Sequence, residues 1–243
     1  AAMTTPRYRS DDAPPARYSR REFLAESGAA VAGATIVAPA LVPMDAAAKA
    51  KPPEGELRVL PPPSKEGGLP LQQAFAQRHS SRAFSARKLP ETVLSDLLWS
   101  AYGVNRAGGD RTAPSWRHLI VIDVYAAMED GLWLYDPKRH ALVPHPAGDI
   151  RALTGQQDFP AAAPLNLVYV ANGQQLSALT PENRKLVCSV DSAFIGQNVY
   201  LFCASAGLAT VFRGSIDYRH LERAMKLDDN QFVTFAQTVG YPK

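Results

Sequence analysis

One segment in the last third of the chain constrains the fold most, because it predicts a helix far longer than average. Thr180 can cap it, Pro181 suits its first turn, and apolar residues continue from Leu186 to Leu201 before Gly207 stops the helix. At about 1.5 Å per residue, the helix would span roughly 40 Å. Its apolar residues lie nearly all round, which predicts burial at the centre of the domain or at a contact between subunits.

The two cysteines of the chain, Cys188 and Cys203, both fall on this helix. A separation of fifteen positions places them roughly 22 Å apart, too far for a disulfide within one chain. We therefore expect both to be buried as small apolar side chains.

Shorter elements surround the long helix. Periodicity and turn residues predict a helix from Pro90 to Tyr102, a strand from Leu119 to Tyr125, a hairpin over residues 131–143, a continuous apolar strand from Leu165 to Ala171, and a last strand from Phe232 to Val239. This mixture predicts an α+β domain.

The first 50 residues differ from the rest. A paired arginine, Arg20-Arg21, precedes a mildly apolar run from Gly28 to Val42, and small residues follow up to Ala50. This order predicts a twin-arginine signal peptide over residues 1–50, recognised by the twin-arginine export machinery of a bacterium. The mature protein would then be periplasmic or secreted, with residues 51–69 as an extended, proline-rich leader to a domain over 70–243. The alternatives are an uncleaved amphipathic anchor or a chance arginine pair.

Composition and motifs argue against several classes. The chain carries 26 basic and 23 acidic residues without a basic run in its body, so no nucleic-acid partner is expected. The five histidines lack metal-ligand spacing, so no metal is expected. The glycine-rich nucleotide-binding motifs and the serine-hydrolase elbow do not occur.

A compact basic segment, Arg78-His79-Ser80-Ser81-Arg82, follows the amphipathic stretch 71–77. Guanidinium groups match phosphate oxygens, and a serine hydroxyl can donate a further bond, so this segment predicts an anion receptor. If the chain is helical or tightly turned here, Arg78 and Arg82 lie on one side. The alternative is a solvated basic helix end.

Six short stretches then carry a resemblance. They are 78–82, 97–104, 111–115 followed by 123–125, 196–201, 207–210 and 237–243. In this order they resemble the nitroreductase-like family of FMN-dependent oxidoreductases, over about residues 70–243. The resemblance implies a central mixed or antiparallel sheet flanked by helices, with the long helix buried. It also implies a homodimer whose long helices pack together, with FMN at the interface.

The resemblance further implies which residues contact FMN. Arg78, Ser80 and Arg82 would hold the phosphate and ribityl chain, and the Pro114-Ser115 loop would approach the isoalloxazine ring. The full expected set is Arg78, His79, Ser80, Arg82, Pro114, Ser115, Trp116, His118, Arg213, Gly214 and Lys243.

The run from Trp116 to Val121 departs from the family, which commonly has amide or small residues here and Asn where His118 stands. His118 is either a hydrogen-bond partner of the flavin edge or a structural histidine. Trp116 either stacks on the ring or packs in the core. Because of this departure, the sequence does not determine how the loop would contact the isoalloxazine ring.

The resemblance implies transfer of hydride or electrons from a donor to a small electron-poor acceptor, such as a nitroaromatic or a quinone. No side chain must act as a nucleophile, so no catalytic residue is assigned. An exported enzyme would meet little NAD(P)H, so the expected donor is a quinol, a redox protein or the substrate itself. The alternatives are a flavin-storing, non-catalytic binding module and a flavin dehydrogenase acting on peptide-derived rings.

Overall fold

The computed structural model describes residues 56–243, so the predicted signal peptide lies outside the described residues. Its elements are β1 (Arg58–Val59), α2 (Leu71–Gln77), α3 (Glu91–Tyr102), η1 (Trp116–His118), β2 (Ile122–Met128), β3 (Gly131–Asp136), β4 (Ala141–His145), η2 (Arg151–Leu153), α4 (Phe159–Ala162), β5 (Leu165–Asn172), η3 (Gly173–Leu176), α5 (Pro181–Ala206), β6 (Ala209–Arg213), α6 (Tyr218–Ala224) and β7 (Gln231–Gly240).

The strands of the described part form one seven-stranded sheet in the order β1-β4-β3-β2-β5-β7-β6. Each neighbouring pair is antiparallel. The α+β prediction is confirmed, and of the two expected sheet types the antiparallel one is found.

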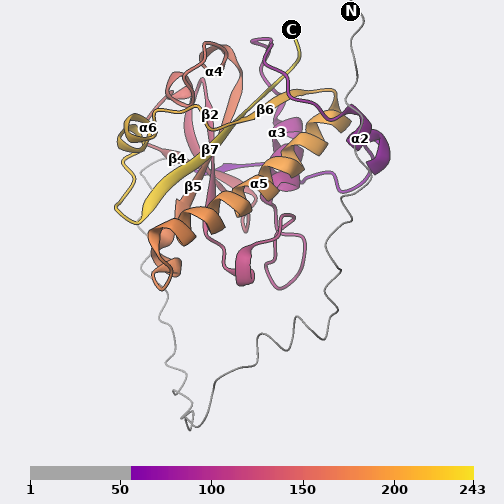
Figure 1. The fold of residues 1–243 in the computed structure, drawn as a ribbon. Coiled ribbons are helices and arrows are strands. Elements are labelled where there is room, and N and C mark those ends of the chain that lie inside the picture. The colour runs from indigo at the N-terminus through magenta and orange to yellow at the C-terminus, as the bar shows by residue number, and fades with distance from the viewer. Residues whose placement is uncertain (1–55) are drawn as a thin grey trace, which may run out of the picture. The chain divides into compact units, whose positions relative to one another are not determined.

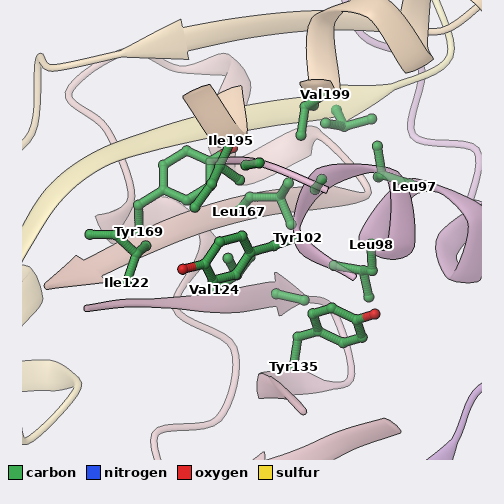
Figure 2. Close-up of a cluster of buried hydrophobic side chains, with 14 of the residues drawn as sticks. Leu97, Leu98, Tyr102, Ile122, Val124, Tyr135, Leu167, Tyr169, Ile195 and Val199 are labelled. Carbon is green, nitrogen blue, oxygen red and sulfur yellow. The ribbon is translucent and has the colours of Figure 1, made fainter. Parts of the chain in front are cut away.

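Both faces of the sheet are covered, as strand β5 shows most clearly. Leu167 and Tyr169 pack into the core beneath α3 and α5, whereas Val168 and Val170 pack into a second core beneath α6. Figure 1 shows α5 running across the sheet, and Figure 2 shows the core between α3, α5 and β5. The predicted continuous apolar strand is found as β5 and is buried on both faces of the sheet.

Helix α5 has the predicted bounds. The Thr180 side chain accepts a hydrogen bond from the Asn183 backbone, and Gly207 ends the helix with a left-handed φ of 66°, which glycine adopts without strain. Cys188 and Cys203 are buried free thiols, as expected.

Helix α5 is not buried all round, however. Three apolar residues spaced four apart, Leu186, Val190 and Phe194, are 62%, 43% and 44% exposed. We call them the α5 stripe. By length and composition alone, α5 is also the described helix that could cross a membrane. In the fold, however, α5 packs on the sheet and on α3 as the core helix of a globular domain does.

Two boundaries differ from the predictions. The domain begins before residue 70, because β1, inside the predicted leader, pairs with β4 and Leu60 is 4% exposed. The strand predicted from residue 119 begins only at Ile122, because the pairing of β2 with β5 starts there, at Ile122 opposite Ala171.

Candidate cofactor-binding site

The basic segment 78–82 is not helical. Helix α2 ends at Gln77, and Arg78 leaves it in an extended conformation, so the two arginines are not aligned by a helical turn as one prediction allowed. Instead the segment lies along β6, where the Ser81 N–H donates to Thr210 O at 2.9 Å. His79 turns back and its Nδ1–H donates to Gln77 O at 2.8 Å.

The positive charges of this region lack counter-charges. The C-terminus runs beside the segment, since Phe84 bridges Pro242 and the Lys243 N–H donates to Ala83 O at 3.4 Å. None of the ion pairs within residues 56–243 involves Arg78, Arg82 or Lys243. Three cationic side chains without carboxylate partners, next to a serine hydroxyl, suit a phosphate group.

Tyr200 on α5 connects this segment to the sheet. Its hydroxyl accepts from the Phe212 N–H at 2.9 Å and lies 2.7 Å from Ser80 Oγ. The Arg78 guanidinium lies over its ring, 5.3 Å from the centroid. Sequence reasoning did not assign Tyr200 a role, although it belongs to the 196–201 stretch that carried part of the resemblance.

Arg213 differs from its prediction. Its side chain is buried at the end of β6, and its guanidinium donates to Thr154 O at 2.7 Å, Asn166 Oδ1 at 3.0 Å and Thr238 Oγ1 at 2.8 Å. Burial lowers its pKa to about 10. Because each guanidinium nitrogen is bonded inside the protein, this side chain supports the loop before α4. Gly214, the other member of the expected pair, is exposed.

The Pro114-Ser115 loop contacts α5 at a different position from the basic segment. Pro114 is exposed and Ser115 is partly buried, while the Trp116 N–H points into the protein and lies 3.2 Å from both carboxylate oxygens of Asp191. The Trp116 ring packs against the core, which favours the core-packing alternative over ring stacking.

The two residues after Trp116 are solvent-facing. The Arg117 guanidinium lies 5.0 Å from the Trp116 ring centroid. The His118 side chain is 91% exposed, with Nδ1 3.9 Å from Asp110 Oδ1. The His118 imidazole therefore lies on the surface of this chain, where it can meet a ligand or a partner. Two consecutive left-handed residues cost of order 1–2 kcal/mol each.

A buried polar cluster supports this loop. Asp191 is 3% exposed, and burial raises its pKa above the usual range. Nearby, the Arg111 guanidinium lies 5.5 Å from the Tyr102 ring centroid, and Arg111 Nε, Arg111 Nη1 and Tyr102 Oη have no hydrogen-bond partner among the described residues. A signal for Asp191 was available, because it is the single charged residue from Leu186 to Ala206.

The two groups of predicted contacts lie beside different positions of α5. On α5, Tyr200 contacts the basic segment and Asp191 contacts the Pro114-Ser115 loop. These two residues are nine helical positions apart, which is about 14 Å along the helix axis. Within residues 56–243, no group of three His, Cys, Asp or Glu side chains could hold a metal ion. The arrangement thus offers an anion site and a separate loop.

Comparison with known proteins decides the family. The nitroreductase family model matches residues 75–241, most of the described chain. The chain belongs to the nitroreductase family. A nitroreductase relative from Methanocaldococcus jannaschii is 28% identical over 171 residues, covering 66% of this chain and 86% of that protein. Because it belongs to this family, the protein is an oxidoreductase.

Solved structures agree with this family assignment. A nitroreductase homologue from Ralstonia eutropha has 42% identity and a TM-score of 0.73, covering 77% of this chain and 90% of that one. The NADPH:FMN oxidoreductase from Vibrio harveyi, solved with NAD+, has 20% identity and a TM-score of 0.52, covering 71% of this chain and 69% of that one. At that identity the second likeness concerns the nitroreductase fold alone.

Proposed function

We propose that this nitroreductase-family protein is an FMN-dependent oxidoreductase that binds the FMN phosphate at Arg78, Ser80, Arg82 and Lys243. The carrying observation is that segment 78–82 lies along β6 beside the C-terminal residues, and that Arg78, Arg82 and Lys243 have no carboxylate partner among the described residues. The Vibrio harveyi protein of the same fold is named for its use of FMN. A dianionic phosphate supplies the counter-charge that these side chains lack.

The chain's own residues bind and orient rather than react. Bound FMN would supply the transfer of hydride or electrons. The guanidinium groups would hold the phosphate by charge-assisted hydrogen bonds, and the positive field would stabilise negative charge that develops nearby. The substrate would be a small electron-poor acceptor, such as a nitroaromatic or a quinone.

A homodimer completes the site in this proposal. The three large apolar side chains of the α5 stripe are exposed in a single chain, and α5 of a second copy would cover them. In a twofold arrangement, the Pro114-Ser115 loop of one subunit can approach the basic segment of the other. The 14 Å separation within one chain is then no obstacle.

The electron donor and the location rest on residues 1–50. A twin-arginine signal would carry the protein to the periplasm or outside the cell, where a quinol or a redox protein replaces NAD(P)H as donor. Cell fractionation with activity assays tests this part. Cytoplasmic protein that rapidly oxidises NADPH would contradict it.

The experiment for the proposed function is a spectrum of the purified protein followed by mass measurement of the cofactor released by heat. We expect yellow protein, FMN as the released molecule, and a flavin spectrum that bleaches with a reductant and returns with a quinone. The second candidate is a flavin-storing module, motivated by the run from Trp116 to Val121 that departs from the family. That candidate predicts bound FMN that does not pass electrons to acceptors.

A further inference from the structure

A chain of hydrogen bonds leads from the sheet to the basic segment. The Phe212 backbone N–H can only donate, so at 2.9 Å it makes the Tyr200 phenol oxygen an acceptor. A phenol carries a single hydrogen, and Ser80 Oγ lies 2.7 Å from Tyr200 Oη. Either hydroxyl can donate in this pair, but only the arrangement in which Tyr200 donates to Ser80 gives the phenol hydrogen an acceptor, and it leaves the Ser80 hydrogen available to a ligand.

We propose that Tyr200 is a positioning residue that makes Ser80 a directed donor to the FMN phosphate. The inference rests on the function proposed above and extends it to a residue outside the expected FMN contacts. Ser80 is exposed, so its remaining hydrogen faces the side open to a ligand. The successive N–H and O–H dipoles point the same way and polarise one another, which strengthens the last donor toward an anion.

The same tyrosine also restrains an arginine. The Arg78 guanidinium lies 5.3 Å from the Tyr200 ring centroid, within the range of a cation–π contact. That contact leaves the edge of the guanidinium available for oxygen atoms. The hydroxyl of Tyr200 thus orients Ser80 and its ring orients Arg78. Replacement by phenylalanine removes the first function and keeps the second.

The test compares FMN with riboflavin, which has the same ring but no phosphate. Dissociation constants are measured by flavin fluorescence on protein stripped of cofactor. We expect Tyr200→Phe to weaken FMN binding roughly three- to tenfold and to leave riboflavin binding unchanged. Ser80→Ala should give a similar FMN-specific loss, and the double variant should be no weaker than Ser80→Ala alone.

A matched control is Tyr135→Phe, which removes a phenol hydroxyl bonded to His140 Nδ1 at 2.9 Å, away from the site. This control should lower stability but keep the FMN-to-riboflavin affinity ratio. A purely structural role for Tyr200 predicts that Tyr200→Phe weakens both ligands equally, and this result would overturn the inference.

Two further outcomes separate the inference from the proposed function. Losses that multiply in the Tyr200→Phe, Ser80→Ala double variant would show two independent contacts and would overturn the inference alone. Wild-type protein that binds no FMN would refute the proposed function and the inference together. If Tyr200→Phe does not fold, the exposed Ser80 still permits the test, and an unchanged affinity ratio in Ser80→Ala refutes the inference.

Discussion

Helix α5 approaches the sheet closely at Gly196, and alanine there should destabilise the protein. An added Cβ would lie 2.5 and 2.6 Å from two ring carbons of Phe212 and 3.2 Å from Gln237 Oε1. The Phe212 ring cannot move freely, because it stacks with Tyr169 and Phe235 at centroid distances of 5.7 and 4.7 Å. Overpacking of this kind costs about 1–3 kcal/mol, and the better helix propensity of alanine returns up to about 1 kcal/mol. Because the Phe212 ring is held on two sides, the upper part of that cost applies, about 2–3 kcal/mol, and after the gain in propensity we expect Gly196→Ala to lower the free energy of unfolding by about 1–2 kcal/mol.

Urea unfolding followed by tryptophan fluorescence measures this loss as a lower midpoint at an unchanged m-value. Gln197→Ala, at the exposed neighbouring position, is the matched control and should stay within about 0.5 kcal/mol of wild type. Phe212→Leu should relieve the clash, so the double variant should lose less than the sum of the two single losses. A Gly196→Ala protein as stable as wild type would refute the described approach of α5 to the sheet.

Two further predictions concern pH and assembly. Burial lowers the pKa of both His140 and His145, so near and below pH 6.5 the unfolded chain binds more protons than the folded one. The stability that these histidines contribute is therefore present above pH 6.5 and is lost as the pH falls below it. The urea concentration at the unfolding midpoint should be lower at pH 5.5 than at pH 7.5. This difference should shrink when both histidines are replaced by glutamine. For assembly, Phe194→Glu places a charge in the α5 stripe and should shift the protein toward monomer in light scattering, whereas Lys138→Glu in the exposed β3–β4 turn should not. A wild-type protein that is already monomeric would contradict the dimer proposal.

Local signals sufficed for the longest elements. Helix α5 has a capping threonine, a first-turn proline and a terminal glycine, and β5 is apolar without interruption, so neither needed information from distant residues. Strand β1 was missed because Arg58 and Val59 gain strand structure only by pairing with β4, more than 80 positions away. The late start of β2 was missed because residues 119–121 are apolar like the strand that follows them, so the local pattern does not show where pairing with β5 begins.

At the site, the residue types of segment 78–82 indicated its chemistry, but the orientations could not be predicted. The inward turn of Arg213 depends on Thr154, Asn166 and Thr238, which lie far from it in the sequence. The role of Tyr200 depends on Ser80, 120 positions away. Such contacts follow from the packed fold rather than from local pattern.

The most direct test of the central claim is the affinity for FMN and for riboflavin of wild-type, Arg78→Ala and Arg82→Ala proteins. Each arginine donates a charge-assisted bond in this account, so each substitution should weaken FMN binding by about 1.5–3 kcal/mol. That range corresponds to roughly tenfold to over a hundredfold in the dissociation constant. Riboflavin affinity should change little, because riboflavin lacks the phosphate. Unchanged FMN affinity in both variants would contradict the assignment of segment 78–82 to the phosphate.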